Sequence, residues 1–389
     1  MKKACLVCNS TDVTEFVEIS QLPIFCNLLL PTRDEAINAT KGDIRLGFCG
    51  HCGHIFNTTF NPDLIKYNEN YENCLHFSPR FHSYVSSLAA SLVKKHNLHN
   101  KEIIEIGCGN GDFLTLLCEF GGNRGYGFDP SYSHKQSEYA VKNNVHFIQD
   151  FFSERYGAYK PDLICCRHVL EHISSPSLYL LNLRNTIGNY QKTVFFFEVP
   201  NVLFIFRDMS IWDIIYEHCS YFSSQSVAWL FNTGGFTVTD ITESFEGQFL
   251  CIEAKQRKGI CSPVSHNGIE KLRRYISEFA TNYMNKTTIW NHRIEQILKN
   301  GEKVVVWGAG SKGVTFLNTI QQKNYINYVV DINPRKQNMF IATTAQQIMP
   351  PSFLKEYRPD TILVMNSIYK DEINQIINNM GLTTKLVVV

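Results

Sequence analysis

The sequence has no excess of charge of either sign. Its 37 lysines and arginines nearly balance 36 aspartates and glutamates, which leaves a formal charge of +1 over 389 residues. No strong electrostatic field therefore favours nucleic acid or a membrane surface, and we expect a small-molecule partner. Charged residues make up 19% and hydrophobic residues 44%, ordinary values for a globular protein, and the length predicts two or three domains.

Long hydrophobic runs are also missing. The most apolar stretch, residues 193–206, is interrupted by Glu198 and Pro200, so we do not expect it to span a membrane. Two lysines near the start have no apolar segment behind them, which predicts no signal peptide and a cytoplasmic location. Thirteen cysteines in such a protein do not indicate a disulfide framework, so an ordered subset suggests metal binding.

Two C-x-x-C pairs stand about forty residues apart in the N-terminal part. The four cysteines are Cys5, Cys8, Cys49 and Cys52. Four thiolates from two such pairs can converge on one tetrahedral ion, which favours a closed, structural Zn²⁺ site. His51 and His54 are alternative ligands, although a site of four thiolates needs neither. The other interpretation is a set of buried free cysteines.

The central part of the chain contains an apolar run, residues 103–106, that is followed by glycines at every second position. The turn glycines are Gly107, Gly109 and Gly111, and Glu105 is the acidic residue of the run. A strand, a glycine turn and a helical pattern predict the first unit of a doubly wound α/β domain, in which the backbone can approach a ligand. A sharp turn without a ligand is the alternative.

Acidic or polar residues end the next three predicted strands. Asp129 follows a strand about twenty residues after the turn, where such folds present a carboxylate to a ribose diol, and Asp150 ends the third strand. The fourth strand runs into Arg167, His168, Glu171 and His172. Ligands sit at the carboxyl ends of the strands, so we expect these side chains near the site. The two histidines also suggest a helical metal pair, for which the sequence indicates no third ligand.

Two further segments suggest a role in substrate binding or catalysis. Residues 61–78 are rich in tyrosine and asparagine, which suits a substrate-facing loop or an ordinary connector. Residues 215–223 place Tyr216, Glu217 and His218 side by side. A glutamate beside an imidazole can raise its basicity, which makes His218 a candidate general base. The alternative is an aromatic loop with a structural role, whose polar groups are hydrogen-bonded within the fold.

A second glycine turn follows a long predicted amphipathic helix. Gly308, Gly310 and Gly313 have the G-x-G-x-x-G spacing, and Asp331 ends the next strand. Taken literally, this pattern indicates a nicotinamide dinucleotide and an oxidoreductase. The segment behind the helix is only about 90 residues long and has few predicted strands. We therefore favour a turn that holds the diphosphate of a nucleotide-linked substrate at a helix N-terminus.

The order of these features resembles the three-domain, zinc-containing sugar C-methyltransferases that use S-adenosylmethionine, such as the TDP-sugar C-3'-methyltransferases. The spacing E-x-G-x-G-x-G is similar to motif I of class I methyltransferases. The other matching pieces are the four cysteines, residues 167–172, 198–201, 217–218 and 221–223, and the second glycine turn. The resemblance implies an α/β fold with a zinc-binding module at 1–75, a Rossmann-like methyltransferase domain at 76–258, and a long helix with a second Rossmann-like module at 259–389.

The resemblance also implies roles for individual residues. Those that would bind S-adenosylmethionine are Glu105, Gly107, Gly109, Gly111, Asp129, Asp150 and Arg167. His218 would remove a proton next to a keto group, Glu217 would orient it, and His172 would hydrogen-bond near the reacting oxygen. The family has a tyrosine where this chain has Ile215, so Tyr216 is the candidate replacement. Methylation of oxygen or nitrogen on another metabolite is the alternative, and the acceptor, the methylated atom and the oligomeric state are left open.

Overall fold

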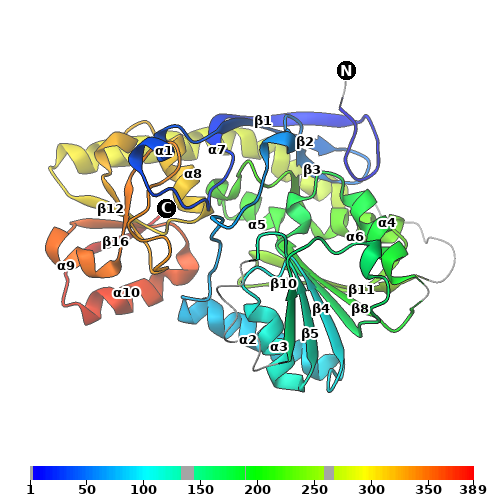
Figure 1. Cartoon of the computed structure of the whole chain (residues 1–389). Coiled ribbons are helices and arrows are strands. Elements are labelled where there is room, and N and C mark those ends of the chain that lie inside the picture. The colour runs from blue at the N-terminus through cyan, green and yellow to red at the C-terminus, as the bar shows by residue number, and fades with distance from the viewer. Residues whose placement is uncertain (1–2, 133–143, 189, 258–266) are drawn as a thin grey trace.

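The computed structural model describes residues 3–132, 144–188, 190–257 and 267–389. Figure 1 shows three parts: an N-terminal sheet across the top, a large sheet at the lower right and a C-terminal α/β module at the left. The expected boundary between residues 258 and 259 lies outside the described residues. None of the helices within the described ranges combines the length and apolarity that a membrane crossing needs.

The N-terminal sheet is antiparallel and has the order β1-β2-β3-β9. Its strands are β1 (Val13–Pro23), β2 (Lys41–Cys49), β3 (Ile55–Asn57) and β9 (Ser220–Tyr221), and α1 (Arg33–Ile37) connects the first two. β9 comes from the candidate catalytic segment, so that segment is built into the sheet that carries the cysteine pairs.

The large sheet has the order β10-β11-β8-β7-β4-β5-β6, in which the last five are parallel and β11 is antiparallel to both neighbours. The strands are β4 (Glu102–Ile106), β5 (Arg124–Phe128), β6 (Val145–Ile148), β7 (Leu163–Arg167), β8 (Val194–Pro200), β10 (Phe236–Ser244) and β11 (Phe249–Gln256). The expected pair at the sheet edge, β10 and β11, is confirmed.

Helices cover both faces of this sheet. They are α2 (Pro79–Lys95), α3 (Asp112–Gly121), α4 (Pro176–Ile187) and α6 (Ser224–Thr233), with α5 (Val202–Arg207) at the edge near the N-terminal sheet. Neighbouring residues of β4 belong to different cores, since Ile103 packs with α2 and α3 and Ile104 packs with α4 and α6. Burial on both faces explains why these strands are continuous apolar runs.

The C-terminal module is a five-stranded parallel sheet with the order β14-β13-β12-β15-β16. Its strands are β12 (Val304–Trp307), β13 (Tyr328–Val330), β14 (Gln347–Met349), β15 (Thr361–Val364) and β16 (Lys385–Val388), and its helices are α8 (Ser311–Thr319), α9 (Leu354–Tyr357) and α10 (Lys370–Asn379), all preceded by α7 (Asn267–Lys299). The sheet has one strand more than the sequence indicated, because β14 is only three residues long.

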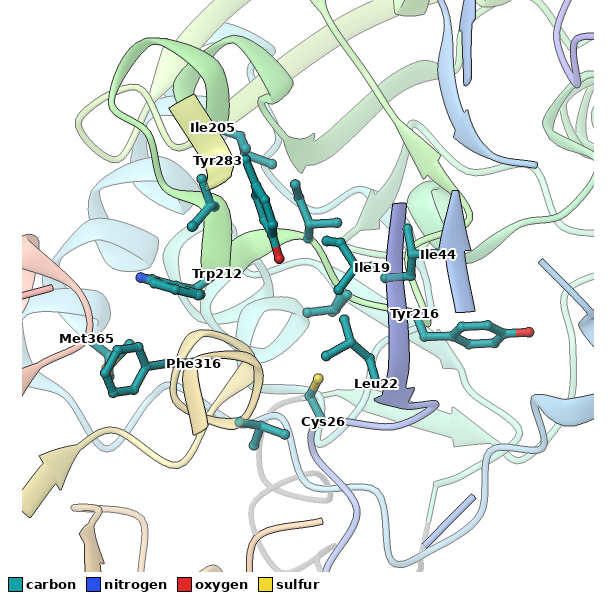
Figure 2. Close-up of a cluster of buried hydrophobic side chains, with 14 of the residues drawn as sticks. Ile19, Leu22, Cys26, Ile44, Ile205, Trp212, Tyr216, Tyr283, Phe316 and Met365 are labelled. Atoms are coloured by element: carbon teal, nitrogen blue, oxygen red, sulfur yellow. The ribbon is translucent and has the colours of Figure 1, made fainter. Parts of the chain in front are cut away.

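One hydrophobic core joins the three parts. Figure 2 shows Ile19 of β1 near Trp212, which lies in a 3₁₀ turn (Ile211–Asp213), and Phe316 of α8 beside it. The Trp212 and Phe316 rings meet edge to face with their centroids 5.2 Å apart. Shared burial of this kind fixes the three parts relative to one another, so the space between them has defined walls.

Candidate functional site

A cavity of about 390 Å³ is lined by residues at the carboxyl ends of both parallel sheets. Its wall includes Gly107 and Gly109 of the first glycine turn and Gly308 and Gly310 of the second. In each sheet the first strand lies between the second and the fourth, which is the switch point where open α/β sheets bind ligands. The two turns therefore open into one space.

The glycines of the first turn serve two purposes. Gly107 has φ of +68°, and a Cβ there would lie 2.2 Å from Cγ2 of Val169; Gly111 has φ of +81°, and a Cβ would collide with the ring of Phe147. Gly109 also has a positive φ, +52°, yet a Cβ there would meet no heavy atom within 4 Å. Packing thus explains two glycines, whereas the third borders open space that fits a ligand lying against the backbone.

Glu105 and Arg167 stand side by side on the wall of the cavity, at the ends of β4 and β7. The buried Glu105 accepts a hydrogen bond from the Leu114 amide at 3.1 Å, and burial raises its pKa to about 8. Arg167 donates from Nε to Glu198 at 2.6 Å and lies over the Phe113 ring. Its Nη2 has no hydrogen-bond partner among the described residues, so a bound ligand can satisfy it.

Glu198 forms the centre of a buried group of charges. Besides Arg167 it contacts the Tyr84 hydroxyl, and its Oε2 lies 3.4 Å from Nε2 of His168. Burial opposes ionisation, but Arg167 and His168 hold the pKa of Glu198 at about 2. Burial also lowers the pKa of His168, yet the nearby carboxylates of Glu171 and Glu198 raise it to about 9.

Asp129 and Asp150 end β5 and β6 as expected, but neither lines the cavity. Asp129 accepts a hydrogen bond from the Gly109 amide at 2.9 Å and another from the Ser131 amide at 2.8 Å. Asp150 accepts from the Tyr156 hydroxyl at 2.7 Å. Asp129 therefore shapes the first turn, and the expected contacts with ribose and adenine stay predictions.

Glu217 is buried and holds its loop in place. One oxygen accepts a hydrogen bond from the Cys26 amide at 2.9 Å, and the other accepts from the Tyr71 hydroxyl at 2.5 Å. Among the described residues it makes no hydrogen bond to the ring of His218. The glutamate thus ties the loop to two N-terminal segments.

His218 lines the cavity, and none of the described residues hydrogen-bonds to its imidazole. Its ring meets that of His172 almost perpendicularly, with the centroids 4.8 Å apart. Burial lowers the pKa of His218 well below its usual value, and the nearby positive charges of His168 and Lys312 lower it further. The ring is therefore neutral at pH 7 and able to accept a proton.

Tyr216 lies away from the other members of the predicted catalytic group. Its hydroxyl accepts a hydrogen bond from the Asn61 amide at 3.0 Å, and its ring packs on Phe60. Figure 2 shows the ring directed away from Trp212. Ile215 lines the cavity instead, so Tyr216 does not supply the hydroxyl that this position lacks.

The second turn is shaped by backbone contacts. A Cβ on Gly313 would lie 1.9 Å from the Gly308 carbonyl oxygen, whereas one on Gly310 would meet no heavy atom within 4 Å. Asp331 accepts a hydrogen bond from the Ala309 amide at 2.7 Å. The first turn of α8 borders the cavity without a side-chain cap, so its amides can face an anion.

Two lysines of the cavity wall were not singled out from the sequence. Nζ of Lys312 lies 2.7 Å from Asp213, and Nζ of Lys336 donates to Asn27 at 2.8 Å and to the Ala309 carbonyl at 3.1 Å. Lys312 lies within the second glycine turn, so its place in that motif could have predicted that it lines the site. Lys336 has no sequence signal, because its contacts depend on how two distant segments pack.

The four cysteines of the two C-x-x-C pairs lie together, with their sulfurs within 4.8 Å of one another. Sγ of Cys5 is 3.6 Å from Cys52, and Sγ of Cys8 is 3.5 Å from Cys49. A tetrahedral Zn²⁺ with bonds of about 2.3 Å needs sulfur separations of about 3.8 Å, so the cluster suggests zinc. His54 is outside it.

His54 connects the cysteine cluster to the loop of His218. Its Nε2 lies 3.2 Å from the Ser220 hydroxyl, and its ring stacks on Phe56 and faces Phe222. Burial lowers the pKa of His54 to about 3, so it stays neutral. Together with the pairing of β3 and β9, these contacts hold the residues just after His218 against the N-terminal sheet.

Two family models match the chain. The methyltransferase domain matches residues 79–241, and the C-methyltransferase C-terminal domain matches residues 260–388. The C-methyltransferase NovU of Streptomyces niveus is 22% identical over 408 residues, which cover 95% of this chain and 90% of NovU.

Solved structures resemble about half of the chain. The 1,6-didemethyltoxoflavin-N1-methyltransferase of Burkholderia thailandensis, with bound S-adenosylhomocysteine, has a TM-score of 0.35 and 13% identity and covers 53% of this chain and 96% of its own. The magnesium protoporphyrin IX methyltransferase of Synechocystis PCC 6803 has a TM-score of 0.35 and 18% identity, covering 46% and 84%.

Proposed function

Because the chain belongs to the S-adenosylmethionine-dependent C-methyltransferases, we propose that it methylates a carbon of a nucleotide-linked keto-sugar, with His218 as the base. One observation carries the proposal: both glycine turns open into one cavity, and His218 lines the same wall. A methyl donor on the first turn and an acceptor anchored on the second can then meet beside one proton acceptor.

The first turn offers the groups that a methyl donor needs. The backbone at Gly109 is open to the cavity, and the unpartnered Nη2 of Arg167 can receive an acceptor atom. Bound S-adenosylmethionine supplies a methyl group on a positively charged sulfur, which leaves without the help of an acid. We propose that Asp129 and Asp150 contact its ribose and adenine.

The second turn offers the groups that a diphosphate needs. The open backbone at Gly310 and the first turn of α8 present amides to the cavity, with Lys312 and Lys336 on the same wall. Amides at a helix N-terminus and lysine side chains both favour anions. The acceptor's sugar would then lie between this anchor and His218.

His218 carries the chemistry in this proposal. Its neutral imidazole removes the proton next to the keto group, and Glu217 holds the loop through Cys26 and Tyr71. Holding both reactants in one site supplies much of the remaining rate enhancement. Tyr216 serves the fold through Asn61.

The test starts with a screen of nucleotide-sugars for a mass gain of one methyl group. With the acceptor found, His218→Ala should lower kcat by about 10²–10⁴-fold, since a general base contributes this much, while calorimetry shows unchanged binding of S-adenosylhomocysteine. His99→Ala, at an exposed histidine, is the matched control. Near-normal turnover by His218→Ala would refute the base assignment.

Two alternatives have their own measurements. NMR of the product distinguishes a new carbon–carbon bond from methylation of oxygen or nitrogen. The strand order of the C-terminal module also suits a dinucleotide, so NADH is titrated into the protein. Enhanced NADH fluorescence would favour the oxidoreductase, and its absence the substrate role of the second turn.

A further inference from the structure

Glu171, His172 and His218 form a cluster on the cavity wall that the proposed function leaves only partly used. One nitrogen or oxygen atom from each lies within 4.8 Å of the others. We propose that His172, beside the carboxylate of Glu171, receives the proton that His218 takes from the substrate carbon, so that the three side chains act as one relay. This inference rests on the proposed role of His218.

The contacts of His172 determine which of its nitrogens carries hydrogen. Nδ1 lies 3.0 Å from the backbone carbonyl oxygen of Glu217 and 2.8 Å from the Tyr67 hydroxyl. A carbonyl oxygen only accepts, so Nδ1 must carry the hydrogen. In neutral His172, Nε2 is then the free acceptor. Tyr67 is a positioning residue, because it acts through His172.

Glu171 supplies the negative charge of the cluster. The residue is 1% exposed, and its Oε2 has no hydrogen-bond partner among the described residues, while Oε1 lies 3.6 Å from Nδ1 of His168. A buried carboxylate oxygen without a donor is unfavourable, and native proteins rarely leave one without a reason. Protonation of His172 or His218 during the reaction would provide that donor.

The surroundings of His218 explain why the proton moves on. Burial lowers its pKa, and the positive charges of His168 and Lys312 lower it further, so an imidazolium there is short-lived. Lys312 is itself paired with Asp213, which leaves Glu171 as the carboxylate of the cluster. Transfer toward Glu171 moves the positive charge next to a negative one.

The proposed step balances. The substrate carbon–hydrogen bond breaks and its electron pair stays on carbon, where it forms the new bond to the methyl group. The bond between sulfur and the methyl carbon breaks with its pair on sulfur. The proton passes from His218 to Nε2 of His172 and later leaves to water. Gaps of up to 4.8 Å are bridged by one water molecule in such a relay.

The same three groups also suit a divalent metal ion, which the test must separate from the relay. The three ligand atoms lie within 4.8 Å of one another, a spacing that allows either a metal ion or a relay with a bridging water. The hydrogen bonds of His172 fix its ring without a metal. The ring of His172 is therefore positioned for the relay without a metal ion.

The first test is NMR of the full chain, labelled with ¹⁵N-histidine and saturated with S-adenosylhomocysteine. Signals are assigned with His172→Gln and His218→Gln. We expect neutral His172 to carry its hydrogen on Nδ1, and we expect Glu171→Gln to change the Nε2 signal of His172. Tyr67→Phe should change the Nδ1 signal and leave that of His218 in place. The controls are Glu154→Gln and Tyr325→Phe, both at exposed positions.

The outcomes separate this inference from the proposed function. Hydrogen on Nε2 of neutral His172, or a His172 Nε2 signal unaffected by Glu171→Gln, would overturn the relay even if His218→Ala is inactive. If the NMR results hold but His218→Ala stays active, the base assignment fails and the relay fails with it. Measurement of bound metal by ICP-MS completes the test: a second equivalent of zinc in the wild-type protein that is lost in Glu171→Gln would replace the relay by a metal site.

A kinetic measurement adds a quantity, the pH profile of kcat, that would not shift if Glu171 had only a structural role. With the acceptor from the screen, Glu171→Gln should lower kcat about tenfold, leave KM within about twofold, and shift the rising limb of the pH profile. Glu171→Asp, which keeps the carboxylate, should restore part of kcat. A loss of kcat without a shift of the pH profile would contradict the relay.

Discussion

The two glycine turns face one cavity from two sheets whose first five strands have the same order. In each, the acid after the second strand accepts a hydrogen bond from the turn: Asp129 from the Gly109 amide at 2.9 Å, and Asp331 from the Ala309 amide at 2.7 Å. In both modules, the acidic residue that the sequence pattern would place at a ribose thus stabilises its own glycine turn through a hydrogen bond. The likeness of the turns therefore says little about which ligand each binds.

The difference lies at the end of the fourth strand of each sheet. After β7, Arg167 and Glu198 form a buried ion pair at 2.6 Å. After β15, the amide of Asn366 pairs with that of Gln248 at 3.0 Å. The first module places buried charges at this strand end, whereas the second places there the neutral amide of Asn366, which pairs with Gln248 of the first module. Substitutions at the ion pair should therefore lower the free energy of unfolding more than substitutions at the amide pair.

The largest effect is expected from Glu198→Gln. This change leaves Arg167 buried without its counter-ion, which should lower the free energy of unfolding by about 4 kcal/mol. Gln248→Ala, which breaks the corresponding amide pair, should lower it by about 1 kcal/mol. Urea unfolding of both variants measures the difference. Equal losses would mean that the two strand ends are energetically alike.

Gly313→Ala is expected to have the next largest effect. Its methyl group would lie 1.9 Å from the Gly308 carbonyl oxygen, and a backbone atom cannot move aside as a side chain can. We expect a loss of about 3 kcal/mol in thermal or urea unfolding. Gly310→Ala, where the space is open, is the control and should keep full stability while weakening binding of the acceptor. A stable Gly313→Ala would disprove the tight helix contact.

Zinc removal should separate the acceptor side of the site from the donor side. The cysteine cluster holds β3, which pairs with β9 just after His218, whereas the first glycine turn lies on another sheet. Chelation should lower turnover about 100-fold, equivalent to about 2.7 kcal/mol, with little change in binding of S-adenosylhomocysteine. Re-addition of Zn²⁺ is the control. Equal loss of donor binding would show that the cluster supports the whole fold.

Sequence patterns were sufficient to predict both modules. The hydrophobic periodicity and the glycine spacing predicted β4 with α3 and β12 with α8, because the strand, the turn and the helix are consecutive in the chain. β14 was missed because three residues carry no period, and the pairing of β9 with β3 was missed because it joins distant segments. Long-range pairing of such short strands leaves no local pattern.

Within the site, the residue types that suit proton transfer were easier to predict from the sequence than the directions in which their side chains point. The residue types at Glu217 and His218 indicated proton transfer, but Glu217 turns to Cys26 and Tyr71, and Tyr216 turns to Asn61. The loop is neither helix nor strand there, so no period tells which side chains share a face. These directions are set by the N-terminal segments that pack on the loop.

The smallest effect concerns pH and tests the buried charges of the first module directly. His168 has its pKa raised to about 9 and Glu105 to about 8, so both hold protons more tightly in the folded chain. The stability that the raised pKa of His168 contributes is fully present below about pH 6.5 and is lost as the pH rises through 9. The stability that the raised pKa of Glu105 contributes is fully present below the usual pKa of a glutamate and is lost as the pH rises through 8. The free energy of unfolding should therefore fall as the pH rises from 6.5 to 9. His168→Asn, which tolerates the positive φ of this position, should flatten the slope, and Asn366→Ala in the second module should leave it unchanged. Urea unfolding at several pH values measures both, and parallel slopes for wild type and His168→Asn would show that the imidazole does not carry the effect.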